Sequence, residues 1–291
     1  MTLIDGRIHN SVGGSYAVMT AEGAFSCRAR GLFRKQGVTP LTGDHVRIEL
    51  TGGGGGYIIE ILPRKNELSR PPVANLDRLF LLSSTIAPRP NLRLLDTLIA
   101  AAELAGIDPV IVFTKCDLAG GEAFAVIYRQ CGFNSFAVSP DSDIDGISAL
   151  LKDKVSAFCG NTGVGKSTLL NRIAPQLALP TGEISDKLGR GRHTTRHVEL
   201  FPAAGGWVAD TPGFSSFEAQ RQAALTKETV AMGFREFARY EGQCRFPDCA
   251  HVKDSGCAIV KAVRAGEIPA SRHESYCALY EALKIKKDWE N

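Results

Sequence analysis

The chain has 291 residues, of which 44% are hydrophobic and 22% are charged, and its formal net charge is +3. These proportions are typical of globular proteins, so they exclude a wholly disordered chain and a fibrous repeat. Every apolar run is shorter than the ~18 residues of a membrane span, and the start of the chain lacks the pattern of a secretory signal, so we expect a cytoplasmic protein. A net charge this small does not by itself predict a nucleic-acid partner.

Residues 1–66 are predicted to form a small β-barrel. Five consecutive glycines at 52–56 indicate a flexible hairpin loop without side chains to pack. Five short strands in this length suit an OB-type barrel, and an SH3-like barrel fits almost as well. The clearest β-rich segments, separated by glycine turns, lie at 15–19, 25–29, 44–50 and 57–61.

Residues 67–218 are predicted to form an α/β domain. It begins with a linker at 68–76, where Pro71 and Pro72 interrupt regular structure. Beyond the linker, apolar strands alternate with helices, which predicts a parallel sheet covered on both faces. The predicted strands are 79–83, 110–113, 135–138, 155–159, 198–201 and 207–209, and the predicted helices are 92–105, 123–130 and 166–173.

Residues 219–291 are predicted to form a helical domain, with helices near 224–240, 256–265 and 271–289. Four residues in this domain, Cys244, Cys249, His251 and Cys257, supply three thiolates and one imidazole within 14 residues. These are the ligands of a closed, tetrahedral Zn²⁺ site, which is structural rather than catalytic. The other cysteines are expected to be buried or incidental, namely Cys27, Cys116, Cys131, Cys159 and Cys277.

A phosphate-binding loop is predicted at 160–167, which reads G-N-T-G-V-G-K-S between an apolar strand and a helix. Its glycines let backbone N–H groups point at phosphate oxygens, and the helix N-terminus adds positive potential. Lys166 would contact the β- and γ-phosphates, and Ser167 would ligate Mg²⁺. The predicted nucleotide contacts here are Gly160, Asn161, Thr162, Gly163, Val164, Gly165, Lys166, Ser167 and Thr168.

A base-binding loop is predicted at Thr114, Lys115 and Asp117, which read T-K-C-D after the strand 110–113. A carboxylate at Asp117 can accept both the ring N–H and the exocyclic amine of guanine, and adenine offers no such donor pair. Lys115 would lie over the base. Thr114 replaces the more usual asparagine, and a hydroxyl makes fewer hydrogen bonds than an amide. Ser139, after the next strand, fits a loop that supports the base through backbone N–H, although a plain loop fits nearly as well.

The segment Asp210-Thr211-Pro212-Gly213 resembles the D-x-x-G element of GTPases. Asp210 would hold Mg²⁺ through water, and the Gly213 N–H would sense the γ-phosphate. A threonine in the preceding loop can close over Mg²⁺ when GTP is present, and we favour Thr195 over Thr194. The glycines around it suit an order–disorder switch, and the alternative is a solvated basic loop.

The residue after D-x-x-G is Phe214, which cannot orient the attacking water as a glutamine does. His193 is the nearby side chain with suitable chemistry, and it is the candidate catalytic residue. The alternative is an ordinary surface histidine, in which case intrinsic turnover would be very slow.

The order of these motifs differs from that of ordinary GTPases. The base loop precedes the phosphate loop, and D-x-x-G comes last, so the same parts appear cyclically rotated. A closed core tolerates this when its original termini lie near each other. The predicted fold is therefore a circularly permuted P-loop GTPase core between an OB-type barrel and a helical zinc-binding domain. In this order, the D-x-x-G element leads directly into the helical domain.

The chain resembles the ribosome small-subunit-dependent GTPase A family (RsgA). The residues that carry the resemblance, besides the motif order, are G-R-H-T-T at 191–195, C-x4-C-x-H-x5-C at 244–257 and R-H-E-S-Y at 272–276. It implies a late assembly factor that binds the small ribosomal subunit and its rRNA in the GTP state, hydrolyses GTP to GDP there, and then leaves. It also implies that His193 acts on the water. The chain departs from the family pattern in two respects. It begins almost at the barrel, without the basic N-terminal extension that some relatives carry, and Lys253-Asp254-Ser255 stands where relatives tend to have an E-P pair before the last zinc cysteine.

RNA contact also has some support in the charge pattern. Basic residues lie around Phe33 in the barrel (Arg28, Arg30, Arg34 and Lys35) and in the loop before D-x-x-G (Lys187, Arg190, Arg192 and Arg196). Both groups can equally be solvated faces. We expect a monomer with GTP/GDP, Mg²⁺ and one zinc ion. The alternatives are a passive RNA-binding scaffold with a structural nucleotide site, and a P-loop ATPase or kinase.

Overall fold

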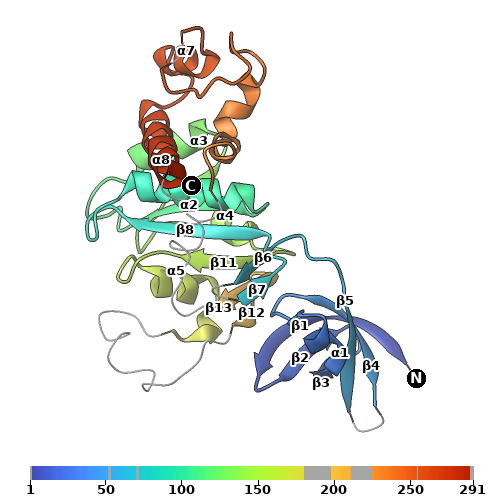
Figure 1. Ribbon diagram of the computed structural model, residues 1–291. Helices are drawn as coiled ribbons and strands as arrows, with labels where there is room; N and C mark the ends of the chain where they lie inside the picture. Colours follow the sequence, from blue (N-terminus) through green and yellow to red (C-terminus); the bar gives the residue numbers. More distant parts are fainter. Residues whose placement is uncertain are drawn as a thin grey trace. The chain divides into compact units, whose positions relative to one another are not determined.

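The structure is a computed structural model, and it describes residues 2–51, 54–69, 72–179, 198–210, 225–253 and 255–288. Contacts within the chain divide it into two compact units. Unit 1 comprises Met1–Arg78, Asp145–Phe158 and Ser167–Phe217, and unit 2 comprises Leu79–Ile144, Cys159–Lys166 and Glu218–Asn291. Figure 1 shows the helices and strands of both.

Unit 1 begins with a five-stranded barrel. The strands follow the order β1-β2-β3-β5-β4, and β4 pairs again with β1, which closes the sheet. The β3–β5 pair is parallel, and the other pairs are antiparallel. This closed five-stranded sheet confirms the predicted OB-type barrel. Its strands are β1 (Leu3–Val12), β2 (Ser15–Thr20), β3 (Gly23–Ala29), β4 (His45–Leu50) and β5 (Gly55–Ile61).

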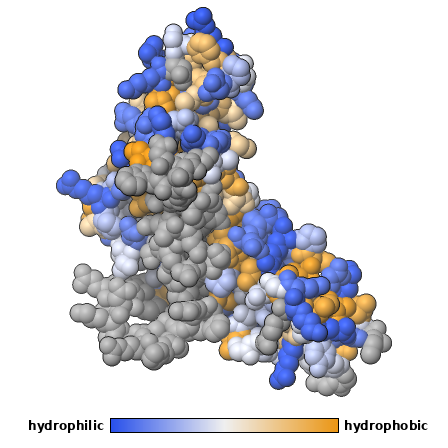
Figure 2. Space-filling model, viewed as in Figure 1, coloured by the Kyte–Doolittle hydropathy of each residue, from blue (hydrophilic) through white to orange (hydrophobic). Residues whose placement is uncertain are grey.

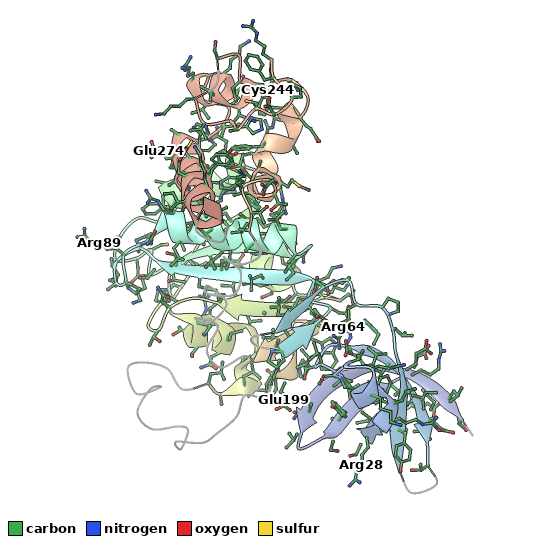
Figure 3. All side chains as sticks on the ribbon, in the orientation of Figure 1. Arg28, Arg64, Arg89, Glu199, Cys244 and Glu274 are labelled. Carbon is green, nitrogen blue, oxygen red and sulfur yellow. The ribbon has the colours of Figure 1, made fainter. Side chains whose placement is uncertain are left out.

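The barrel interior is filled by alternate apolar residues of its strands, including Ile8, Val18 and Ile48, which are fully buried. Phe33 of the short helix α1 (Gly31–Lys35) also packs into this core. Phe33 is therefore a core residue and not an aromatic platform among the basic side chains. Arg28, by contrast, is exposed and projects from the barrel (Figure 3).

The segment 68–76 was expected to be interrupted by its prolines, but it contains part of a short hairpin of β6 (Glu67–Ser69) and β7 (Pro72–Ala74). Proline is tolerated as the first residue of a strand at a sheet edge, where Pro72 lies. Side-chain amides on both sides close the hairpin. The Lys65 N–H donates to Asn75 Oδ1 at 3.0 Å, and the Leu76 N–H donates to Asn66 Oδ1 at 2.9 Å.

The remaining strands of unit 1 are β11 (Val155–Cys159), which ends in unit 2, β12 (Glu199–Ala203) and β13 (Gly206–Asp210). β11 and β13 are parallel, but β12 and β13 are antiparallel, which corrects the expected all-parallel sheet. The reason is the two-residue turn Ala204–Gly205, in which both residues have positive φ, as tight hairpins require. β12 also pairs with β1 of the barrel, where Glu199 lies opposite Asn10.

Unit 2 contains the strand order β10-β9-β8, formed by β8 (Arg78–Ser84), β9 (Asp108–Thr114) and β10 (Asn134–Ala137). β9 and β10 are parallel, as predicted. Helix α2 (Leu92–Leu104) begins at Asn91, whose side chain accepts from the Leu94 N–H, and α3 (Glu122–Gln130) follows β9. α2 lies between this sheet and the C-terminal helix of the chain (Figure 1).

The C-terminal part of unit 2 is helical, but the predicted helix at 224–240 is wrong. Two short 3₁₀ helices, η4 (Val230–Gly233) and η5 (Arg235–Tyr240), occupy this segment. Gly233 packs so closely on α2 that a Cβ atom there would lie 2.7 Å from Ala100 Cβ, and Phe234 leaves the helical conformation. The other two predicted helices are confirmed as α7 (Ala258–Arg264) and α8 (Ala270–Asp288).

The surface around these helices mixes hydrophilic and hydrophobic residues in the view of Figure 2. Within the described parts of the chain, none of the helices has the length and apolar character needed to cross a lipid bilayer. In the described part of the chain, unit 1 also contains two short helices, α4 (Asp145–Ala149) and α5 (Lys166–Ile173), and a 3₁₀ turn, η1 (Pro175–Leu177), follows α5.

Candidate nucleotide and metal sites

The predicted phosphate loop lies between the end of β11 at Cys159 and the start of α5 at Lys166. Gly163 and Gly165 have φ values of +80° and +92°, which other residues rarely adopt, so the glycines shape the turn. Gly160 has no space for a side chain, because a Cβ atom there would lie 2.9 Å from the Leu82 carbonyl oxygen. The loop therefore has the strand–turn–helix geometry with which such motifs bind phosphate.

The predicted base loop is joined directly to the phosphate loop. Thr114 ends β9, and its hydroxyl donates a hydrogen bond of 2.5 Å to the Val164 carbonyl oxygen in the phosphate loop. Both residues are buried. The structure thus brings together two motifs that are 50 residues apart in the chain, and the Thr114 hydroxyl forms the hydrogen bond that joins the two loops.

The residues that follow Thr114 turn away from the sheet. Lys115 has a left-handed φ of +58°, and its Nζ donates to the Ala87 carbonyl oxygen at 2.9 Å, which ties the base loop to the β8–α2 connection. The Thr85 hydroxyl donates to the Lys115 carbonyl oxygen at 2.9 Å. Asp117 is exposed, so its carboxylate is accessible to a ligand.

Ser139 lies beside the base loop, because the Cys116 N–H donates to the neighbouring Val138 carbonyl oxygen at 3.1 Å. The Ser139 N–H, which we expected to support the base, donates to Ser142 Oγ at 2.8 Å. The two serine hydroxyls also lie 2.8 Å apart. Sequence reasoning did not identify Ser142, because nothing in the motif marks a serine three residues further on.

A small cavity of about 50 Å³ lies beside the phosphate loop, between β8 and the first turns of α2. Arg89, at the end of the β8–α2 connection, lines it and is exposed (Figure 3). The phosphate-loop residues in its wall are Gly160, Asn161 and Val164, and the α2 residues are Leu94, Leu95 and Leu98.

Several predicted site residues lie outside the described residues, namely His193, Thr195 and Gly213. Asp210 is the last residue of β13. Ser167 and Thr168 follow Lys166 in the first turn of α5, where backbone N–H groups have no partner within the helix.

The four predicted metal ligands come together. One donor atom each from Cys244, Cys249, His251 and Cys257 lies within 4.8 Å of the others. The Cys244 and Cys257 sulfur atoms are 3.9 Å apart, and each lies 3.6 Å from His251 Nδ1. A regular tetrahedron with metal–sulfur bonds of about 2.3 Å and metal–nitrogen bonds of about 2.0–2.1 Å has edges of about 3.8 and 3.6 Å. The cluster can therefore hold a tetrahedral metal ion.

Helix α8 holds the turn that carries the histidine ligand. His251 has a left-handed φ of +57°, and its carbonyl oxygen accepts from His273 Nε2 at 2.7 Å. The preceding carbonyl oxygen, that of Ala250, accepts from the Tyr276 hydroxyl at 2.8 Å. Hydrogen bonds of this kind, made outside the ligand atoms themselves, orient a metal ligand. The sequence does not predict them, because His273 is 22 residues from His251.

Comparison with known proteins covers nearly the whole chain. The RsgA GTPase family model matches residues 61–220, and the RsgA N-terminal domain matches residues 5–58. The small ribosomal subunit biogenesis GTPase RsgA of Caldanaerobacter subterraneus is 43% identical, over 99% of this chain and 98% of the relative. That of Geobacillus kaustophilus is 41% identical, over 98% of this chain and 99% of the relative.

Solved structures agree with the sequence comparison. The crystal structure of YloQ, a circularly permuted GTPase, has a TM-score of 0.82 and 34% identity, and the match covers 98% of this chain and 96% of that chain. YjeQ from Thermotoga maritima has a TM-score of 0.79 and 29% identity, over 97% of this chain and 99% of that chain. The fold is therefore a circularly permuted GTPase with an N-terminal barrel and a C-terminal helical region, and the chain belongs to the RsgA GTPase family.

Proposed function

We propose that this protein is a late assembly factor of the small ribosomal subunit, which hydrolyses GTP to GDP and phosphate on the particle and is thereby released. The observation that carries the GTPase part is the hydrogen bond between Thr114 and Val164, because it joins a phosphate loop and a base loop into one site. The printed names of the relatives, small ribosomal subunit biogenesis GTPases, support the particle on which it acts.

The proposed roles of the site residues follow from their places. Lys166, at the start of α5, would neutralise the β- and γ-phosphates, and Ser167 would ligate Mg²⁺ together with Thr195. Asp210, at the end of β13, would hold the ion through water. Mg²⁺, when bound, would neutralise charge on the phosphates, and the exposed Asp117 would select guanine.

We also propose that His193 orients the attacking water and that the Gly213 N–H senses the γ-phosphate. Phe214 follows D-T-P-G in the sequence and has no group that can polarise water, so another side chain is needed. Turnover would be slow in the free protein and would rise when the particle places His193.

The metal of the Cys₃His cluster is proposed to be zinc, at one ion per chain. Thiolate and imidazole donors select Zn²⁺ over Mg²⁺ or Ca²⁺, and four protein ligands leave no open position for catalysis. The ion would be structural, so it would hold the segment 244–257 in shape.

We propose that the barrel contacts rRNA. We also propose that the protein is cytoplasmic and acts as a monomer. Arg28 and Lys35 have exposed side chains on the barrel, and their charges suit phosphate groups. Arg30 is paired with Glu49, so it contributes less net charge to such a surface. Because phosphate contacts release counterions, binding should weaken steeply as salt rises.

The test is GTP hydrolysis with and without purified small ribosomal subunits, at low and at high salt. We expect strong stimulation at low salt and its loss at high salt. If subunits leave multiple turnover unchanged at both salt concentrations, the particle-activated function is wrong and a passive scaffold is favoured.

Two variants tie the activity to the predicted loops. Lys166→Ala should abolish hydrolysis without unfolding the protein, because it removes a charge that acts on the transferred phosphoryl group. Asp117→Asn should lower the affinity for GTP and raise that for xanthosine triphosphate, since an amide can donate to the carbonyl that replaces the guanine amine. Equal displacement of bound nucleotide by ATP and GTP would contradict the base-loop assignment.

A further inference from the structure

A fully buried arginine joins α8 to two other elements of unit 2. Arg272 lies in the first turns of α8 and has no exposed surface. Its Nη1 donates to Asp96 Oδ1 of α2 at 2.6 Å, and its Nε and Nη2 donate to the two oxygens of Glu236 in η5 at 2.8 and 3.2 Å. Both carboxylates are buried as well. The three side chains thus form an ion network without solvent access.

Aromatic rings surround this network. The Arg272 guanidinium lies 4.6 Å from the centre of the Phe234 ring, and the Tyr128 hydroxyl donates to Asp96 Oδ1 at 3.0 Å. Buried ion pairs add little net stability, because desolvation offsets the attraction. A misaligned pair, however, leaves buried charges without partners, which costs several kcal/mol. The network therefore strongly resists any shift of α8 against α2.

The same helix α2 borders the phosphate loop. Its residues Leu94, Leu95 and Leu98 line the same cavity as Gly160, Asn161 and Val164 of the phosphate loop. α2 also packs on β9, whose last residue, Thr114, donates to the Val164 carbonyl oxygen. Asp96, which binds Arg272, lies between these leucines in sequence and faces α8. Gly233 and Arg235 add contacts to α2, the latter through Glu103 at 2.6 Å. A shift of α2 at the phosphate loop would therefore be transmitted to α8.

The other end of the connection is the metal cluster. The residue after Arg272 is His273, which binds the His251 carbonyl oxygen, and Tyr276, one turn further along α8, binds that of Ala250. A series of contacts thus runs from the phosphate loop through Thr114 and β9 to α2, and from α2 through Arg272 and α8 to the turn that carries a metal ligand.

We propose that this connection couples the two sites, so that nucleotide bound at the phosphate loop and metal bound at the Cys₃His cluster each strengthen the binding of the other. The proposal rests on the assignments of these two sites made above. Each ligand favours one position of its loop, and Arg272 permits one relative position of α2 and α8. By linkage, the effect is the same in both directions.

The test compares the Kd for GDP of zinc-loaded protein with that of protein stripped by a chelator. We expect the stripped protein to bind GDP at least about fivefold more weakly, which is the lower end of typical coupling between sites. The reverse measurement is the rate at which zinc passes to a chromogenic chelator, and saturating GDP should slow it. An equal Kd for GDP in the loaded and stripped proteins would overturn the proposal.

Variants locate the coupling in the network. Arg272→Lys keeps a buried positive charge but loses the planar fork that binds both carboxylates, so it should reduce the coupling while zinc and GDP still bind. The triple variant Arg272→Met, Asp96→Leu, Glu236→Leu removes all three charges and should abolish it. Arg264→Met, at an exposed position on α7, is the matched control and should keep it. Coupling that persists in the triple variant would refute the role of this network.

The results of these experiments distinguish failure of the coupling from failure of the nucleotide-site or zinc-site assignment. If the chain binds no GDP or no zinc, the assignment of that site fails, and the coupling fails with it. If both ligands bind and neither affects the other, only the coupling is wrong.

Discussion

Replacing Thr114 with valine tests the contact that joins the two nucleotide loops. The Thr114 hydroxyl donates to the Val164 carbonyl oxygen, and both residues are at most 5% exposed. Valine has nearly the same shape as threonine, so the variant removes the donor without opening a cavity. The phosphate loop then keeps a buried carbonyl oxygen that has lost this partner.

The expected size of the effect follows from that burial. A buried acceptor left without a donor costs about 1–3 kcal/mol. If nucleotide binds only when the two loops are joined, the cost of leaving the Val164 carbonyl oxygen unpaired is subtracted from the free energy of nucleotide binding. At 1.4 kcal/mol per factor of ten, the Kd for GDP should rise about 5- to 150-fold.

Equilibrium titration of GDP, by calorimetry or by a fluorescent analogue, measures this change. Thr114→Ser is the matched control, because it keeps the hydroxyl and should stay within about threefold of the unaltered protein. A Thr114→Val variant that binds GDP as tightly as the Thr114→Ser variant would show that the loops do not depend on this hydrogen bond.

Two further predictions concern backbone space and pH. Gly160→Ala should lower GDP affinity by at least tenfold in the same titration, because its Cβ would press on the Leu82 carbonyl oxygen, whereas Gly120→Ala has open space and should leave it unchanged. Burial and the nearby Arg7 lower the pKa of His9 to about 4, while an unfolded histidine titrates near 6.5. The unfolded chain then binds more protons between these values, so stability should fall by up to about 3 kcal/mol as the pH drops from 6.5 to 4. In denaturant titrations, His9→Gln should reduce this loss, and an unchanged pH profile would contradict it.

The parts of the site that were predicted from sequence are those whose chemistry is local. The phosphate loop needs glycines, a lysine and a serine in one short segment, and the structure gives it the expected strand and helix. The metal cluster likewise lies within one segment, and its four ligands converge. In both cases, neighbouring residues carry most of the geometry, so spacing alone is informative.

The predictions that failed depended on distant partners. In place of the predicted helix at 224–240, two 3₁₀ helices meet beside Gly233, which packs closely on Ala100, far away in sequence. The hairpin at 67–74 was not predicted, because the prolines indicated an interruption, while the two asparagine contacts that close the hairpin join residues ten positions apart. The base-loop motif likewise does not reveal that the Thr114 hydroxyl binds the Val164 carbonyl oxygen of the phosphate loop. No local pattern contains these partners.

Arg272 is the strongest example, because its carboxylate partners lie 36 and 176 residues away. From sequence alone, an arginine near the start of a polar helix is expected to be solvated. In the folded chain it is fully buried, and the helix that carries it also binds the turn of the metal cluster. Arg272 therefore matches no local sequence pattern, yet it binds α2, the helix that borders the phosphate loop. Variants of Arg272 should change the coupling between the nucleotide site and the metal cluster while each site still binds its own ligand.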